Sequence, residues 1–332
     1  MAVKKMLPKN NKKILSPPLV ETTRVVVVGT GFVGSTAAYT MMVQGVASEI
    51  ILIDVNKNKC EGEAMDLEHG LSFVKQSRVW AGDYSDCKDA DVVVITAGLG
   101  QKPGQTRLEL AAINAKIIGG IIEQIRHYTD KAVILMVTNP LVTNPLDVMT
   151  YVALKKSGLP NYQVFGTGTT LDSSRFRYLL AQEFGVAPDS MAAYLIGEHG
   201  DSEVPVISHA NLMGENITSF KEYDQKLVDD AYNHTKNAAQ EVICKKGATY
   251  YAIALAISRI VRAILFDEDH VFPLSSLLTG QYGLNDVCLS LPSVVGRTGI
   301  KRVLEVKLND EELQKLRQSA KIISETIKSI KL

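Results

Sequence analysis

Residues 25–39 read VVVVGTGFVGSTAAY, in which an apolar run enters a glycine-rich turn and then a helical stretch. The glycines Gly29, Gly31 and Gly34 have the spacing G-x-G-x-x-G, and Asp54 ends the next apolar run 20 residues after the last of them. A glycine triplet alone is a weak signal. Between a strand and a helix, with an acid at this distance, it predicts a dinucleotide-binding turn.

Each part of this pattern has a physical role in holding a dinucleotide. Gly29 permits a tight turn, Gly31 lets the backbone approach a pyrophosphate, and Gly34 allows close packing, while the helix N-terminus supplies N–H groups and a positive dipole. Asp54 can accept hydrogen bonds from a ribose diol but would repel a 2′-phosphate, and no arginine follows at once. We therefore expect NAD rather than NADP; the alternative is that the glycines only turn a corner.

Apolar runs and helical stretches alternate along the chain from Arg24 onward. The runs with the composition of buried strands are RVVVVG, EIILID, ADVVVITAG and KAVILMVTN. This alternation is typical of an α/β fold, and it predicts a Rossmann-type doubly wound parallel sheet with helices on both faces. We therefore expect an NAD-binding domain over residues 24–165.

After about residue 165 the pattern changes. The runs MAAYLIG, SEVPVISH, HVFPLSSLLTG and DVCLSLPSVVG carry Pro and Gly at their edges, as antiparallel strands do. A last helix is predicted after Asn309 as N-cap, with Glu312 in the capping-box position. We expect a mixed α+β substrate domain over residues 166–332.

The composition narrows the function classes. Lys plus Arg number 36 and Asp plus Glu number 36, so nothing draws the chain to nucleic acid or to an acidic membrane surface, and a small-molecule partner is expected. The longest apolar run, from Tyr250, is broken by Arg259 and Arg262 and is too short for a membrane span. The cysteines are scattered without zinc-ligand spacing, which predicts a reduced cytoplasmic protein without a metal site: Cys60, Cys87, Cys244 and Cys288.

Residues 1–23 are rich in lysine and proline and lack the apolar core of a secretory signal. They predict a flexible tail or an arm on a neighbouring subunit. A transit peptide is the less favoured alternative, because no arginine precedes Arg24.

Four further residues would suit hydride transfer to a 2-oxo acid. His199 lies between two glycines in YLIGEHGDS, where a loop presents a proton donor. Asp172 and Arg175 are three residues apart in TTLDSSRFR, so one helical face could carry a carboxylate that holds an imidazole and a cationic anchor. Arg107 follows a Gly and Pro segment suited to a lid. Taken singly, they could equally be a structural histidine, a surface ion pair and a solvated helix start.

The motifs GTGFVG, AGLGQKPGQTRLEL, TNP, TTLDSSRFR, IGEHGDSEVP and KKGATYYAIA together resemble the lactate and malate dehydrogenase family, in its bacterial form, from about Arg24 to the C-terminus. The resemblance implies that His199 gives a proton to the substrate carbonyl as hydride arrives from NADH, and that Asp172 stabilises the imidazolium. It implies that Arg175 grips the substrate carboxylate. Arg107 would polarise the carbonyl when the loop of residues 99–110 closes.

The same resemblance implies the substrate. Gln101 occupies the lid position where malate-type relatives carry an arginine, and a neutral amide cannot offset the desolvation of a second carboxylate. Thr249 leaves room for a methyl group. Pyruvate and L-lactate are therefore expected, and a malate or other 2-hydroxy-acid dehydrogenase is the alternative. The resemblance also assigns further positions to the cofactor's surroundings: Val33, Lys59, Tyr84, Gly98, Leu99, Val137, Asn139 and Thr167.

The resemblance extends to assembly and regulation. It implies a homo-oligomer, either a tetramer or a dimer of dimers. Arg177 matches an arginine that binds fructose 1,6-bisphosphate in many bacterial relatives, but Ala192 stands where the histidine of that site would be. Activation by this sugar phosphate is therefore doubtful.

The pentapeptide VTNPL occurs twice in succession, in the stretch VTNPLVTNPLDV of residues 137–148. The family has a single Asn-Pro here, whose Asn reaches the substrate or the cofactor. Counting from the preceding strand makes Asn139 the site residue, and counting back from the following helix makes it Asn144. We favour Asn139, because a central strand is held on both sides whereas a loop accepts extra residues. Asn144 would then be a helix N-cap followed by Pro145.

Two alternatives follow from this region. The inserted residues could crowd the nicotinamide pocket and leave a protein that binds NAD but turns over poorly. Tyr151 and Lys155 also match the Tyr-x-x-x-Lys of short-chain dehydrogenases. The glycine spacing argues against that class, which uses T-G-x-x-x-G-x-G.

Overall fold

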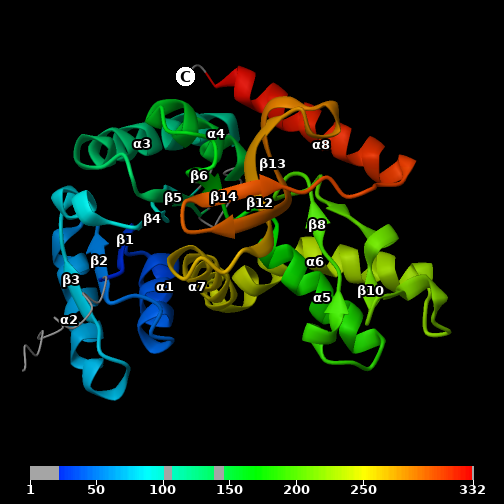
Figure 1. Cartoon of the computed structure of the whole chain (residues 1–332), viewed down its shortest axis with the longest axis horizontal. Coiled ribbons are helices and arrows are strands. Elements are labelled where there is room, and N and C mark those ends of the chain that lie inside the picture. Colours follow the sequence, from blue (N-terminus) through cyan, green and yellow to red (C-terminus); the bar gives the residue numbers. More distant parts are fainter. Residues whose placement is uncertain (1–21, 101–106, 138–145, 331–332) are drawn as a thin grey trace, which may run out of the picture.

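The computed structural model describes residues 22–100, 107–137 and 146–330. Within these residues the largest sheet has nine strands (Figure 1). Six of these strands are parallel: β1 (Arg24–Val28), β2 (Glu49–Ile53), β3 (Arg78–Ala81), β4 (Val92–Ile95), β5 (Val133–Met136) and β6 (Val164–Gly166). Their order, β3-β2-β1-β4-β5-β6, is that of a doubly wound dinucleotide-binding sheet. The predicted fold class is confirmed.

Helices cover both faces of these strands. One face carries α1 (Phe32–Val43), α2 (Lys57–His69) and α7 (Tyr251–Leu265), and the other carries α3 (Arg107–Tyr128), α4 (Leu146–Ser157) and α8 (Asp310–Ser329).

β1 shows why the glycine-rich turn is preceded by a run of valines. Val25 and Val27 pack on the α1 side of the sheet, and Val26 and Val28 pack on the α3 side. Successive side chains of a strand point to opposite faces. A strand that is buried on both sides is therefore apolar throughout rather than alternating.

The second half of the chain extends the sheet and adds a smaller lobe. β12 (His270–Thr279), β13 (Asn285–Gly296) and β14 (Gly299–Val303) form an antiparallel meander, which joins β6 where Ser275 pairs with Gly166. The predicted antiparallel runs from residues 270 and 286 are β12 and β13. The lobe, at the right of Figure 1, contains α5 (Thr170–Glu183), α6 (Gln225–Lys246), β7 (Met191–Ala192), β10 (Asn211–Leu212) and β11 (Glu215–Asn216).

A short hairpin connects the lobe to the sheet. It consists of β8 (Leu195–Ile196) and β9 (Val204–Pro205), and the loop between these strands carries His199. Gly197 at the start of this loop forms a bridge with Ser290 of β13. The sheet thereby fixes the position of the loop.

The last helix is capped as predicted. Asn309 Oδ1 accepts the N–H of Glu312 at 2.8 Å, and Glu312 Oε2 accepts the N–H of Asn309 at 3.0 Å. β6 contains the boundary predicted at residues 165/166, and the division into two domains stays a prediction. Most of the predicted tail, residues 1–21, lies outside the described residues. Among the helices of the described ranges, none combines the length and apolar character of a membrane span.

Candidate active site

The turn between β1 and α1 requires glycine at two positions. Gly29 has φ +103°, and a Cβ there would lie 2.8 Å from the backbone nitrogen of Ala97. A Cβ on Gly34 would lie 1.9 Å from the carbonyl oxygen of Gly29. These two glycines therefore allow α1 to start directly against the turn.

Gly31 differs from its two neighbours in the motif. Apart from Gly31 itself and its two chain neighbours, no atom of the described residues lies within 4 Å of the place where its Cβ would be. Gly31 is also the N-cap of α1, and no described side chain caps this helix end. The first N–H groups of α1 therefore face open space, which suits the pyrophosphate of a dinucleotide.

Asp54 is fixed at the end of β2 by the same turn. Its Oδ2 accepts the N–H of Thr30 at 2.7 Å, and its Oδ1 accepts the N–H of Asn56 at 2.9 Å. Burial acts to raise the pKa of Asp54, but these backbone hydrogen bonds, the Thr30 hydroxyl and the charge of Lys59 together hold its pKa below the usual value. Asp54 is therefore a half-buried carboxylate with lone pairs left for a ribose diol, and the residues at this turn fit NAD.

The other positions expected near the cofactor differ in exposure. Val33, Val137 and Thr167 are buried, Tyr84 and Gly98 are half-buried, and Lys59 and Leu99 are exposed. Leu99 is bracketed by Asn114 of α3, which accepts its N–H at 2.8 Å and donates to its carbonyl oxygen at 3.1 Å. Asn114 was not predicted from the sequence, although a buried asparagine within an apolar helix stripe is a usable signal.

The structure brings together three of the four residues expected to act on the substrate. His199 Nδ1 donates to Asp172 Oδ2 at 2.5 Å, and Arg175 Nη1 donates to Asp172 Oδ1 at 2.9 Å. The spacing of three residues on α5 does place Asp172 and Arg175 on one face. The fourth residue, Arg107, begins α3, and its side chain lies outside the described residues, as does Gln101.

Charge rather than burial decides the protonation of this cluster. Burial would lower the pKa of His199, but the Asp172 carboxylate opposes it and the pKa rises to about 9. Burial would raise the pKa of Asp172, but His199 and Arg175 hold it below its usual value. At neutral pH the cluster is therefore an imidazolium on a carboxylate. Its ring nitrogen Nε2, which is not bound to Asp172, is left to meet a substrate.

Glu203 is a buried carboxyl of the same loop that the sequence did not single out. It is 4% exposed, and its Oε1 has no hydrogen-bond partner among the described residues. Burial and the neighbouring Asp172 raise the pKa of Glu203 well above the usual value, which favours its neutral form. Asp172 therefore remains the charged partner of His199.

The segment expected on the substrate side also meets the cofactor turn. Thr249 is buried just before α7, and the ring of the following residue, Tyr250, stacks on Phe32 with centroids 5.2 Å apart. Phe32 is the first residue of α1, directly after Gly31. The motifs GTGFVG and KKGATYYAIA, more than 200 residues apart, are therefore neighbours in space.

Comparisons with known proteins agree with this geometry. Residues 23–166 match the lactate/malate dehydrogenase NAD binding domain, and residues 169–331 match the lactate/malate dehydrogenase alpha/beta C-terminal domain. The chain belongs to the lactate/malate dehydrogenase family. It is accordingly an NAD-dependent oxidoreductase, as the turn between β1 and α1 predicts.

Individual members of the lactate/malate dehydrogenase family resemble the chain over nearly its whole length. L-lactate dehydrogenase of Acetivibrio thermocellus is 47% identical over 326 residues, which cover 97% of this chain and 99% of that protein. L-lactate dehydrogenase 1 of Clostridium acetobutylicum is 48% identical over 315 residues, or 93% and 99% of the two chains. The structure of the minor L-lactate dehydrogenase from Enterococcus mundtii in its ligands-bound form matches with a TM-score of 0.90 at 40% identity, covering 94% of this chain and 99% of that one.

The doubled pentapeptide of this dehydrogenase spans residues that the structure does not describe, and both Asn139 and Asn144 fall there. The described ends on either side are fixed. Val137 donates its N–H to the carbonyl oxygen of Ile95 at 2.9 Å, and Leu146 is completely buried at the start of α4. The choice between the two asparagines stays a prediction.

Tyr151 and Lys155 have a structural role in this dehydrogenase. The Tyr151 hydroxyl donates to Asp286 Oδ2 at 3.1 Å, and Lys155 Nζ donates to Asp286 Oδ1 at 2.8 Å. Burial raises the pKa of Tyr151, whereas short-chain dehydrogenase chemistry requires a lowered one. The pair joins α4 to β13 and does not form a second catalytic site.

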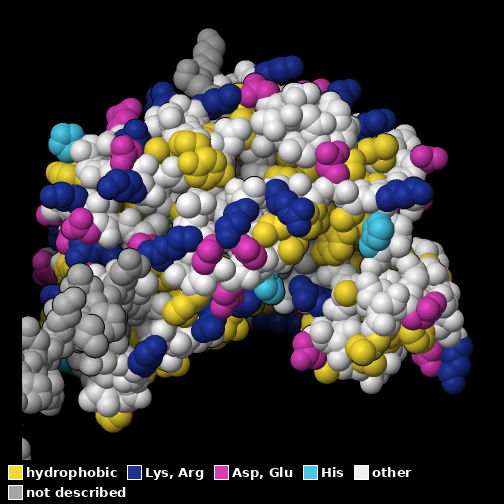
Figure 2. Space-filling model, viewed as in Figure 1, with side chains coloured by type: hydrophobic (Ala, Val, Ile, Leu, Met, Phe, Trp, Pro, Cys, Tyr) yellow, Lys and Arg dark blue, Asp and Glu magenta, His cyan; other side chains and the backbone are white. Residues whose placement is uncertain are grey.

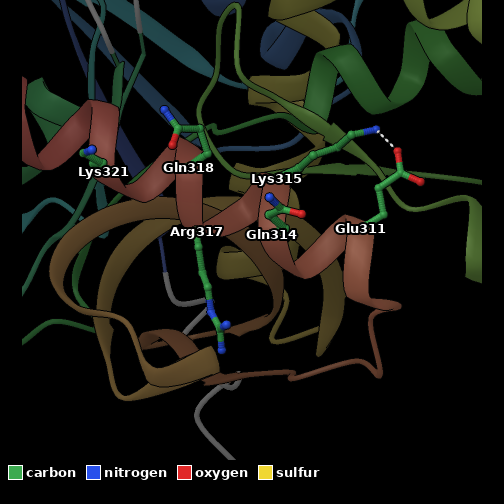
Figure 3. A pocket seen from close by; sticks show the side chains of 6 residues that line it. All are labelled: Glu311, Gln314, Lys315, Arg317, Gln318 and Lys321. Carbon is green, nitrogen blue, oxygen red and sulfur yellow. Dashed lines mark ion pairs between the residues drawn. The ribbon is translucent and has the colours of Figure 1, made fainter.

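Charged groups on the face shown in Figure 2 are those of a solvated surface. Figure 2 shows Lys and Arg side chains intermixed with Asp and Glu over the visible face. The hollow in Figure 3 lies on the outer side of α8, opposite its buried residues Leu316, Ala320 and Ile323, and contains the ion pair between Lys315 and Glu311 at 2.6 Å. It is lined by polar side chains of that one helix: Glu311, Gln314, Lys315, Arg317, Gln318 and Lys321. It is therefore not the site of the redox chemistry.

Proposed function

We propose that the chain is an L-lactate dehydrogenase that reduces pyruvate to L-lactate reversibly, with His199 as proton donor. The observation that carries this proposal is the cluster in which one carboxylate, Asp172, holds both the imidazole of His199 and the guanidinium of Arg175. A 2-oxo acid needs both partners, because its carboxylate requires a cation and its carbonyl oxygen requires a proton. The full-length similarity to L-lactate dehydrogenases supports the same conclusion.

The cofactor would be held by the turn between β1 and α1 and by the end of β2. Gly29, Gly31 and Gly34 with the N-terminus of α1 would hold the pyrophosphate, and Asp54 would hold a ribose. NADH supplies the hydride when it is bound there. Every other requirement of the reaction falls on side chains of the protein.

Substrate orientation falls to Arg175. Its Nη1 is used by Asp172, which leaves further N–H donors of the guanidinium for a bidentate contact with the substrate carboxylate. Thr249 would face the substrate methyl group. Arg107 would polarise the carbonyl, and Gln101 would disfavour a second carboxylate; both assignments rest on the resemblance to the family.

The proton is supplied by His199. Its Nδ1–H is bound to Asp172, so Nε2–H is the donor to the carbonyl oxygen. The alcohol forms as the C–H and O–H bonds are made, and the imidazole is left neutral with Asp172 fixing its tautomer. One proton from solvent restores the imidazolium. The reverse reaction requires neutral His199 to accept the proton of lactate.

We also propose a cytoplasmic homo-oligomer. Large apolar side chains are exposed on the layer formed by α1, α2 and α7, where α1 packs against α7, and a second copy would bury them. They include Tyr39, Val43, Met65, Tyr251 and Leu255. Arg177 has a buried Nε without a described hydrogen-bond partner. Ala192 has only a methyl group where a histidine would share an anion with Arg177, so activation by fructose 1,6-bisphosphate is doubtful.

A substrate panel with NADH tests the proposed function. Purified protein should oxidise NADH with pyruvate, at a kcat/KM at least ~100-fold above that for oxaloacetate, because the second carboxylate finds no cation. Equal or higher kcat/KM for oxaloacetate would contradict the proposed substrate. An absence of turnover with any 2-oxo acid, despite NADH binding, would contradict the enzyme assignment itself.

A further inference from the structure

A third buried carboxylate reaches the loop of His199 from α4. Asp147 is the second residue of α4 and is 0% exposed. Its Oδ2 accepts the backbone N–H of His199 at 2.9 Å, and its Oδ1 accepts the hydroxyl of Ser275 at 2.6 Å. One side chain thus joins α4, the loop of His199 and β12.

The loop is anchored at three successive backbone positions. Gly197 exchanges hydrogen bonds with Ser290 of β13, with N···O distances of 2.9 and 2.8 Å. Glu198 donates its N–H to the hydroxyl of Ser319 on α8 at 2.8 Å. Of these anchors, only the one at His199 itself is a side chain that can carry a charge.

The identity of Asp147 calls for a reason beyond hydrogen bonding. An asparagine could accept from His199 through its oxygen and donate from its nitrogen to the Ser275 hydroxyl, because a hydroxyl both donates and accepts. It would do so without the cost of burying a charge. A carboxylate at this position costs stability, so its charge is the property that an amide would not provide.

Resting on the proposed function, we propose that Asp147 is a positioning residue for proton transfer: its oxygen fixes the backbone of His199 against Asp172, and its charge stabilises the imidazolium. Asp147 would therefore contribute to proton transfer in two ways that can be measured separately. The first depends only on a hydrogen-bond acceptor, and the second depends on ionisation.

The charges that face the imidazole come from several elements. Asp172 and Arg175 approach from α5, Asp147 from α4, and Glu203 belongs to the loop itself. Glu198, also in the loop, acts on Asp147 and binds Ser202. Burial raises the pKa of Asp147 to about 6, so it is ionised at neutral pH beside the imidazolium. The raised pKa of Glu203 favours its neutral form, whereas the carboxylate of Asp147 adds its charge to that of Asp172 beside His199.

The test compares Asp147→Asn with Asp147→Ala. In Asp147→Asn the acceptor remains and the charge is lost, so kcat at neutral pH should stay within roughly threefold of wild type. The NMR titration of His199 in the protein without cofactor or substrate should move about half a unit to one unit lower in pKa. In Asp147→Ala, kcat should fall roughly 10- to 100-fold, because the imidazole loses its fixed geometry. The Kd for NADH should stay unchanged in both variants.

Asp286→Asn is the matched control, because it removes a carboxylate that binds the other part of α4 and has no contact with His199. It should alter neither the His199 titration nor kcat. The proposal is overturned if Asp147→Asn leaves the pKa of His199 unchanged, or if Asp147→Asn and Asp147→Ala lower kcat by the same factor. Should Asp147→Ala fail to fold, Asp147→Asn still decides through the titration. That titration needs no turnover, so it tests Asp147 even if wild-type protein proves inactive with pyruvate.

Discussion

The turn between β1 and α1 and the cluster around His199 bind charged groups by different means, the first through backbone and the second through side chains. At the turn between β1 and α1 the backbone would bind the phosphates, because the glycines leave space there and the N–H groups at the start of α1 face that space. At His199 charged side chains take this role: Asp172 of α5 binds the imidazole, and Asp147 of α4 binds the backbone N–H of His199. At the turn an added Cβ would clash with the backbone or occupy the space of the cofactor, and at the cluster the loss of the Asp172 charge would remove the partner of the imidazolium. Substitutions should therefore fail differently at the two places.

The largest loss is expected for Asp172→Asn. This change leaves the shape of the cluster intact but removes the charge that holds the imidazolium, and kcat for pyruvate reduction should fall roughly 10³- to 10⁴-fold. NADH affinity, measured by fluorescence titration, should stay near wild type. Glu311→Gln on the outer face of α8 serves as a control with normal kcat. An Asp172→Asn enzyme within tenfold of wild type would remove the distinction between the two regions.

The doubled pentapeptide offers the next largest effect. We expect Asn139→Ala to lower pyruvate kcat/KM roughly 100-fold, because the site amide is lost, whereas Asn144→Ala should mainly lower the melting temperature through the loss of a helix cap. Steady-state kinetics and thermal melts on both variants are the measurement. Near-normal turnover in Asn139→Ala together with inactive Asn144→Ala would reverse the assignment.

Within the glycine turn, Gly34→Ala should mainly affect stability and Gly31→Ala should mainly affect NADH affinity. Gly34→Ala places a Cβ 1.9 Å from a carbonyl oxygen and should lower the melting temperature of the protein without cofactor. Gly31→Ala meets only open space and should leave that melting temperature unchanged, while NADH affinity falls roughly tenfold or more because the Cβ occupies pyrophosphate space. Equal NADH affinity for Gly31→Ala and wild type would show that the dinucleotide does not cross this turn.

Substrate choice should respond to one added charge. Gln101→Arg supplies a partner for a second carboxylate, so kcat/KM should fall for pyruvate and rise for oxaloacetate, with the ratio shifting roughly tenfold or more. The measurement is NADH oxidation with each acid in turn. Unchanged selectivity would remove Gln101 from the substrate site.

The two regions also differ in how far they could be predicted from the sequence. The cofactor turn lies within one contiguous stretch, so its glycines and the following acid carried the prediction. Asp172 and Arg175 were predictable because helical periodicity alone places them together. Asp147 meets His199 across 52 positions and Ser275 across 128, and no local pattern encodes such contacts.

Short elements were missed for a related reason. β3 and β6 were not predicted, since RVWA and VFG lack the continuous run of aliphatic residues that marked the equally short β4 and β5. Their places in the sheet are set by neighbouring strands rather than by their own composition. β6 nevertheless matters, because it is the strand on which the meander of β12 to β14 joins the parallel sheet.

The pH dependence of the two reaction directions tests the central claim most directly. His199, with a pKa of about 9, must be protonated to reduce pyruvate and neutral to oxidise lactate. As pH rises through about 9, kcat/KM for pyruvate should therefore fall by about tenfold per pH unit, and kcat/KM for lactate should rise to a plateau. Rates in both directions that do not change across this range, or a profile that stays the same in Asp172→Asn, would contradict an imidazolium held by Asp172 as the proton donor.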